Sequence, residues 1–178
     1  MSIDDDLTRT IAIEARLGMV AQGLGRDANA LIQEMRELPF ELIEAFVETD
    51  FVVTDGEITY VLNISQTMPD TLTAALQSLS AHSITIVTAW NPYSAKLSNY
   101  DNRERQSLLE RVLRMRGEHW LSAKGTSKDG SWAEESFAIL NLSHTQAAAI
   151  GRVFQQHAVV FCNTGSVVEL VPCFTESA

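Results

Sequence analysis

Cysteine is scarce in this sequence: Cys162 and Cys173 are the only two among 178 residues. Their spacing matches no zinc-binding pattern, and so few thiols are typical of a protein that works in a reducing compartment. The fold must therefore rest on a hydrophobic core. A chain of about 150 residues can bury roughly 68–70% of the surface that its unfolded form exposes, so this length is sufficient.

Long apolar runs and basic charge are also in short supply. No run approaches the roughly 18 apolar residues that span a bilayer, and the first residues, MSIDDDLTRT, carry acids where a signal peptide carries Lys or Arg. We expect a cytoplasmic protein without a membrane partner. Thirteen Lys and Arg against 23 Asp and Glu give a net charge of −10. This charge repels a phosphate backbone, so nucleic acid is not an expected partner.

The acidic excess lies mainly at the start of the chain. Residues 1–50 contain eleven acids and four arginines, for a net charge of −7. Residues 1–38 are predicted to form a helical pair, whose first helix ends at Gly23 and whose second ends before Pro39. We expect this pair to pack on an α+β domain of residues 39–178; the alternative is an arm that binds a basic protein partner.

After Pro39 the sequence alternates between strand-like and helix-like segments. The clearest feature is Asp55-Gly56, which predicts a two-residue hairpin loop with Gly56 at positive φ. Ser143 is predicted to cap the last helix. Strands are predicted over residues 49–54, 57–64, 84–90, 119–124, 132–140, 157–161 and 167–171, and helices over residues 69–80, 102–116 and 145–156.

The order of these elements indicates the fold class. From residue 84 it is strand, helix, strand, strand, helix, strand, which is the split βαβ or ferredoxin-like unit. We predict an α+β fold with a mostly antiparallel sheet, extended by extra hairpin strands and covered by helices on one face. A doubly wound parallel sheet is the alternative, but the three predicted hairpins favour antiparallel neighbours.

Strong catalytic motifs are missing. The sequence has no Gly-rich phosphate loop, no GxSxG, no HExxH and no CxxC pair, and its four histidines are scattered over different predicted elements. We therefore predict no metal site and no cofactor.

Two segments are nevertheless unusual for a pure scaffold. In TAWNPYS, a buried strand ends in a polar turn that contains Thr88, Trp90 and Asn91, and side chains at such a place often bind ligands. An Asn-Pro turn around a core Trp is the plainer interpretation. In GSWAEESF, alternation places Trp132 and Glu134 on one face of a strand. If that face lines a cleft, Glu134 could act as a general acid or base.

The same segments resemble a known family. The strings TAWNPYSAKLSNYDNRERQSLL, GSWAEESFAI and AAAIGRVFQQHAVVF, together with FVETDFVV, resemble the bacterial family called domain of unknown function 3293, over residues 45–171. The resemblance implies candidate positions without a known chemistry. The sequence departs from the family pattern at Phe46 and Phe51, where tyrosines are expected. The polar positions that match are Thr49, Thr88, Asn91, Asn102, Glu134 and Gln155.

These residues support a first hypothesis, a small-polar-ligand pocket that is either a binding site or an enzyme site. Glu134 is the candidate catalytic residue. Asn91 and Glu134 should lie together, because the first and third strands of the split unit are the central pair. The candidate ligand-binding residues are Thr88, Trp90, Asn91, Asn102, Trp132 and Gln155.

Two other functions are compatible with the composition. In the first, the protein is a noncatalytic interaction or regulatory module that uses its acidic N-terminal helices. In the second, nucleic acid binds to the five arginines between residues 103 and 116. Glu104 and Glu110 lie on the same predicted helix as these arginines, which favours a partly paired, solvated face instead.

Overall fold

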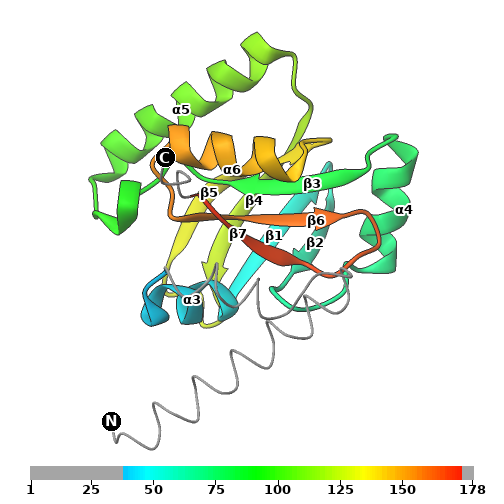
Figure 1. Cartoon of the computed structure of the whole chain (residues 1–178), viewed down its shortest axis with the longest axis horizontal. Helices are drawn as coiled ribbons and strands as arrows, with labels where there is room; N and C mark the ends of the chain where they lie inside the picture. Colours follow the sequence, from blue (N-terminus) through cyan, green and yellow to red (C-terminus); the bar gives the residue numbers. More distant parts are fainter. Residues whose placement is uncertain (1–37, 174–178) are drawn as a thin grey trace, which may run out of the picture.

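The computed structural model describes residues 38–173, so the predicted helical pair lies, up to residue 37, outside the described residues. Pro39 precedes the first described helix, and several short helices and strands then follow one another (Figure 1). In chain order the elements are α3 (Phe40–Val47), β1 (Thr49–Asp55), β2 (Ile58–Leu62), α4 (Asp70–Ser78), β3 (Ser83–Val87), the 3₁₀ turn η1 (Pro92–Ser94), α5 (Asn99–Arg116), β4 (Trp120–Ser127), β5 (Ala133–Leu140), α6 (His144–Val153), β6 (Ala158–Asn163) and β7 (Glu169–Pro172).

The seven strands of residues 38–173 form one curved sheet in the order β2-β1-β4-β5-β3-β6-β7. Each pair of neighbours is antiparallel. The predicted α+β class with an antiparallel sheet is therefore confirmed, and the parallel alternative is wrong. Strands β3 and β5 pair directly, with Val87 at the end of β3 opposite Phe137. The chain that follows Val87 thus leaves the sheet beside the first half of β5.

The β1–β2 hairpin is confirmed, but its loop is shifted by one residue. Asp55 pairs with Ile58, so the two loop residues are Gly56 and Glu57. Gly56 has a φ of 60°, as predicted, whereas Glu57 is not among the residues with positive φ. Glycine at the first loop position with an ordinary second residue is the pattern of a type II′ turn, not of the predicted type I′ turn.

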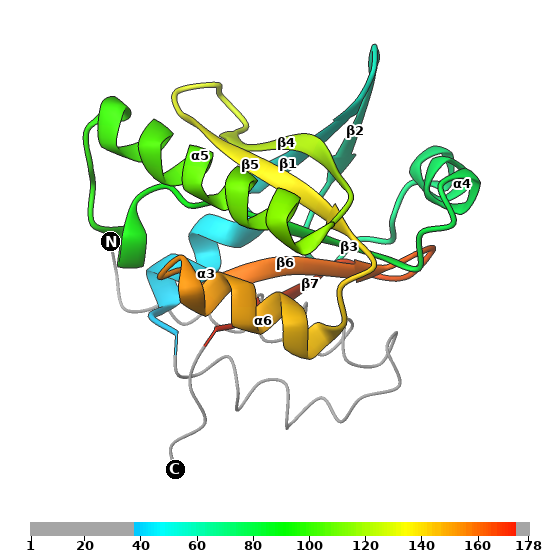
Figure 2. The same cartoon turned by 90° about the horizontal axis from the view of Figure 1, so that it is seen from above.

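Helices cover both faces of the sheet, which corrects the prediction of helices on one face only. Figures 1 and 2 show α5 and α6 on one side, α3 on the other, and α4 at one end. Two separate hydrophobic clusters result. Leu109 and Leu113 of α5 pack with Val87 and Ile139, while Ile43 of α3 lies in the other cluster. Helix α3 was not predicted, because its eight residues are too few to show a helical period clearly.

The buried face of α5 is partly polar. Leu108 and Met115 have the spacing of a helical apolar face, yet both are exposed, Met115 by 87%. The buried stripe consists instead of Asn102, Gln106, Leu109 and Leu113. Two amides therefore occupy core positions beside two leucines. The fold brings these amides against the chain that leaves β3.

Helix α6 begins as predicted. The Ser143 hydroxyl accepts a hydrogen bond from the Gln146 amide at 3.2 Å, and the Gln146 side chain accepts one from the Ser143 amide at 2.8 Å. This reciprocal arrangement is a capping box.

Candidate functional site

The segment after β3 remains attached to the sheet through side chains. The Thr88 hydroxyl donates to the carbonyl of Glu135 at 2.7 Å and accepts from the Trp90 amide at 3.1 Å. The chain then turns away from the sheet at Asn91. Thr88 thus fixes the direction in which the following residues leave the sheet edge.

Asn91 is the centre of this turn. Its backbone is left-handed, with φ 45° and ψ 65°, a conformation that asparagine tolerates better than most residues. Its Oδ1 accepts from the Leu97 amide and from Asn102 Nδ2, both at 3.0 Å. The Asn91 amide in turn donates to Asn102 Oδ1 at 2.8 Å. Both the backbone and the side-chain oxygen of Asn91 are therefore held in place.

Helix α5 holds the same segment from behind through two further residues. Gln106 Oε1 accepts from the Ala89 amide at 3.0 Å, and Arg105 Nε donates to the Ala89 carbonyl at 2.7 Å. A second nitrogen of Arg105 donates to the carbonyl of Phe154, just after α6, at 2.8 Å. Arg105 therefore ties the turn after β3 to the end of α6.

The Asn91 side chain points its nitrogen at Glu134. Asn91 Nδ2 donates to Glu134 Oε1 at 2.6 Å, across 43 positions of sequence. The predicted meeting of these two residues is thereby confirmed. It follows from the pairing of β3 with β5, since the end of one strand lies beside the beginning of the other.

Both residues line a pocket of about 360 Å³, which we call the Asn91 pocket. Trp90 and Trp132 also line it, as predicted. The Trp132 ring lies beside Gly125 of β4, where a built Cβ would be 3.8 Å from Trp132 Cζ3, an ordinary contact distance. Its remaining walls come mainly from α3, β1 and β6. They include Leu42, Phe46, Phe51, Ile86, Val160, Lys96, Gln156 and His157.

The predicted site residues divide into two groups. Thr88, Trp90, Asn91, Trp132 and Glu134 all line the Asn91 pocket. Asn102 does not line it: its side chain is only 1% exposed and accepts a hydrogen bond from the Asn91 amide. Gln155 does not line the pocket either; its Oε1 accepts from Arg105 at 3.4 Å, and the neighbouring Gln156 takes the lining position.

Thr49 and the two unexpected phenylalanines also lie at this pocket. Phe46 and Phe51 stack with their ring centroids 6.3 Å apart, and all three residues line the cavity. At these two positions, where the resemblance led us to expect tyrosines, the pocket therefore has apolar rings.

Several residues that build the site could not be identified from the sequence. Arg105, Gln106 and Gln156 do not belong to the motif positions, yet each binds the backbone of the turn or of the segment after α6. One signal was available for Gln106, which lies four positions after Asn102 and so shares its helical face. Without the helix packing, that face could not be recognised as buried.

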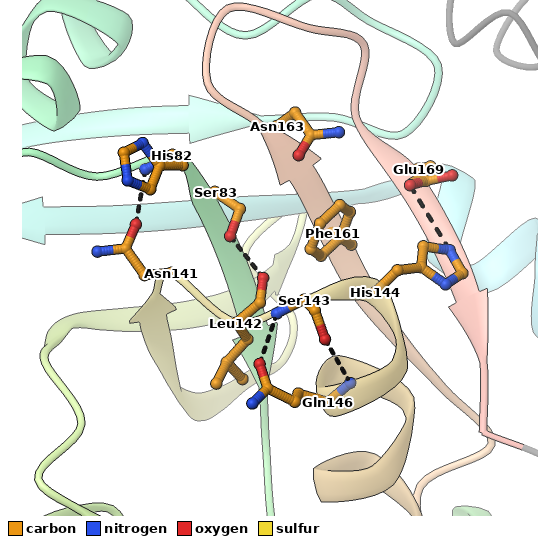
Figure 3. A pocket seen from close by; sticks show the side chains of 10 residues that line it. All are labelled: His82, Ser83, Asn141, Leu142, Ser143, His144, Gln146, Phe161, Asn163 and Glu169. Atoms are coloured by element: carbon orange, nitrogen blue, oxygen red, sulfur yellow. Dashed lines mark hydrogen bonds and ion pairs between the residues drawn. The ribbon is translucent and has the colours of Figure 1, made fainter.

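A wider hollow of about 630 Å³ lies at the start of α6 (Figure 3). Its polar groups mostly bond to one another: the Ser83 hydroxyl donates to the Leu142 carbonyl, and the His82 amide donates to Asn141 Oδ1, both at 2.6 Å. His144 Nε2 lies 3.7 Å from the buried Glu169 carboxylate. None of the predicted site residues lies there, so the Asn91 pocket is the candidate functional site.

The two thiols and three of the five arginines between residues 103 and 116 have structural surroundings. Burial raises the pKa of both Cys162 and Cys173 to about 12, so both are neutral at physiological pH. Arg114 and Arg116 form ion pairs with Glu110 and Glu118 at 2.6 and 3.1 Å. With Arg105 bonded to carbonyls, three of the five arginines are engaged within the fold.

Metal clusters and membrane-spanning helices are both missing from the described part of the chain. Between residues 38 and 173, no group of three or more His, Cys, Asp or Glu side chains is placed to hold a metal ion. Among the helices of that same stretch, none has the length and apolarity to cross a membrane.

Comparison with known proteins identifies the segment that contains this site. Neither a curated protein nor a solved structure matches the chain. The family match is shorter than the resemblance suggested, but it includes the turn after β3, Glu134 and α5. Residues 87–159 match the model of the family described as protein of unknown function (DUF3293), which confirms the family predicted from the sequence.

Proposed function

We propose that the Asn91 pocket binds a small ligand with an apolar body and a head that donates hydrogen bonds, such as an amine or amide. Glu134 would receive the head. Its Oε1 is occupied by Asn91 Nδ2, while no described residue donates to its Oε2. A donor group on the ligand would therefore complete the hydrogen bonding of the carboxylate.

The walls support an apolar body. Trp90, Trp132, Phe46 and Phe51 offer aromatic surface, and the volume of about 360 Å³ is within the range of small-molecule sites. Aromatic walls with a few fixed polar groups are typical of such sites, because apolar contact supplies affinity and the polar groups orient the ligand.

The observation that carries this proposal is the conformation of the turn. Asn91, Tyr93, Ser94 and Gln155 all have positive φ, and the Tyr93 amide donates to the Gln155 carbonyl at 2.7 Å. Asparagine tolerates this region, whereas each of the other three residues costs free energy of the order of 1–3 kcal/mol, and conformations of this kind cluster at ligand sites. Here the strained turn aims Asn91 Nδ2 at Glu134.

Glu134 is also the group that would exchange a proton with the bound head, were the site catalytic. It is the only carboxylate that lines the Asn91 pocket among the described residues. We propose binding as the function and assign Glu134 the acid–base role within it.

We further propose that residues 83–163 form a ferredoxin-like unit, which the antiparallel order β4-β5-β3-β6 supports.

A thermal-shift screen of the full chain against nucleosides, amines and amino acids tests the proposal. A ligand at about 100 times its dissociation constant should add about 2.7 kcal/mol, which corresponds to a rise of several degrees in Tm for a chain of this size. Glu134→Gln should keep the parent Tm and lose the shift, because it removes the acceptor that the head uses.

Glu104→Gln is the matched control. It changes the same chemical group on the exposed side of α5, so its ligand response should equal that of the parent. A ligand that shifts the parent and Glu134→Gln equally would contradict the role of Glu134 in binding.

A further inference from the structure

A second pocket lies on the opposite face of the sheet from the Asn91 pocket. It has a volume of about 310 Å³ and is lined by Thr54, Gln106, Ser122, Lys124, Glu135 and Phe137, among others. We call it the Gln106 pocket. Glu134 and Glu135 are adjacent in β5, so alternation directs one to each face of the sheet. The two pockets therefore present different carboxylates, although Ser136 of β5 lines both of them.

The wall formed by α5 carries an amide with an unused donor. Gln106 is only 4% exposed, and its Oε1 is fixed by the Ala89 amide at 3.0 Å. Its Nε2 is buried and has no hydrogen-bond partner among the residues that the structure describes. Exchanging the two amide atoms would break the bond to Ala89, so the nitrogen stays where it is. An unused buried donor is unfavourable unless an acceptor is supplied.

The sheet side of the same pocket carries two opposite charges. Lys124 of β4 and Glu135 of β5 are direct partners in the register, so their side chains emerge on the same face. Such neighbours commonly pair, yet no ion pair within 4.0 Å joins these two in the described structure, and both are exposed. The pocket therefore offers one cationic group, one anionic group and one buried amide donor.

We propose that the Gln106 pocket binds a small zwitterion of the amino-acid type. Its carboxylate accepts hydrogen bonds from Lys124 and from Gln106 Nε2, and its ammonium group donates to Glu135. The hydroxyls of Thr54 and Ser122, which line the same pocket, supply further hydrogen bonds. A simple anion or a simple cation satisfies only half of this arrangement, so the site favours a ligand that carries both charges.

Nitrogen-15 NMR titration of the full chain with L-alanine tests this proposal, with acetate and methylammonium as single-charge probes. L-alanine should give saturable shifts in the side-chain amide signals of Gln106, and each single-charge probe should bind about tenfold more weakly or worse. Equal affinities for L-alanine and acetate would overturn the proposal. So would the absence of a saturable shift in the Gln106 signals.

Variants separate the pocket from general salt effects. Lys124→Gln and Glu135→Gln alter exposed residues and should each weaken L-alanine binding about tenfold, whereas Arg103→Gln and Glu104→Gln, exposed on α5, should not. Gln106→Glu keeps the acceptor for Ala89 but removes the donor, and it should abolish binding. If Gln106→Glu does not fold, Lys124→Gln and Glu135→Gln still test the proposal. Unchanged L-alanine binding in both of these variants would refute the site.

Discussion

Asn91 shows how much a single asparagine does in this fold. Its side-chain oxygen accepts two hydrogen bonds from the 97–102 segment, its nitrogen donates to Glu134, and its backbone is left-handed. No other common side chain combines this acceptor and donor with tolerance of positive φ. Aspartate comes closest, since it preserves the acceptor and the conformation but replaces the donor by a second carboxylate oxygen.

Asn91→Asp is therefore expected to lower the free energy of unfolding by about 1–3 kcal/mol at neutral pH, because a carboxylate would then face Glu134 where the 2.6 Å bond was. Urea denaturation measures the loss. Combining the change with Glu134→Gln should restore stability, since the new amide can donate to the introduced carboxylate; no recovery would contradict this geometry.

The residue scale also shows what could be predicted. The meeting of Asn91 with Glu134 followed from strand order, because it needs only the pairing of two strands. The burial of the Asn102 and Gln106 side chains could not be predicted in this way, because a buried amide and an exposed amide look alike in a sequence. Gln155 and Gln156 were separated only by the local backbone, where Gln155 adopts a φ of 58°.

At the scale of elements, short segments with strong local signals were predicted best. The β1–β2 hairpin and the cap of α6 follow from local chemistry and are present. The buried face of α5 was predicted less well, because Leu108 and Met115 fit the helical period but lie on the exposed side. Apolar periodicity alone cannot identify a buried helix face on which two of the four residues are amides.

The hairpin loop offers a clean test of backbone strain. Gly56 has a φ of 60°, and a Cβ at this position would meet nothing within 4 Å, so replacing the glycine changes conformational energy without a clash. Gly56→Val is expected to lower the stability by about 1–2 kcal/mol, read as a lower Tm in calorimetry. Glu57→Val, in the same loop at ordinary φ, should change Tm little. Equal melting of Gly56→Val and the parent would refute the assigned turn.

At the scale of the whole molecule, the sheet separates two hydrophobic clusters and two pockets. The antiparallel sheet was predictable, because hairpin connections force antiparallel neighbours. The two-sided cover was not, because α3 lacks a clear period and α4 was expected on the same face as the other helices. Each face consequently has its own core, and Cys162 and Cys173 fall into different cores.

The two thiols report on the integrity of these cores. Both have a pKa raised from 9.0 to about 12 by burial, so between those values a thiol ionises in the unfolded chain but not in the folded one. Stability should therefore fall as the pH rises above about 9. Urea denaturation across this range should show a smaller fall for the Cys162→Ala, Cys173→Ala double variant.

A thiol reagent provides the companion measurement. At pH 8 the folded chain should react slowly, and two thiols per chain should react at once in denaturant. Rapid reaction of either thiol in the folded chain would show that its core is open.

The hold of α5 on the turn after β3 has a consequence for local unfolding. Asn102, Arg105 and Gln106 bond directly to the backbone of Ala89 and Asn91, and Leu109 and Leu113 anchor the same helix in the core. The turn cannot open by itself while those bonds persist. It should instead open together with α5 as one cooperative unit, so the free energy of detaching a whole helix protects the geometry of Asn91 at the pocket.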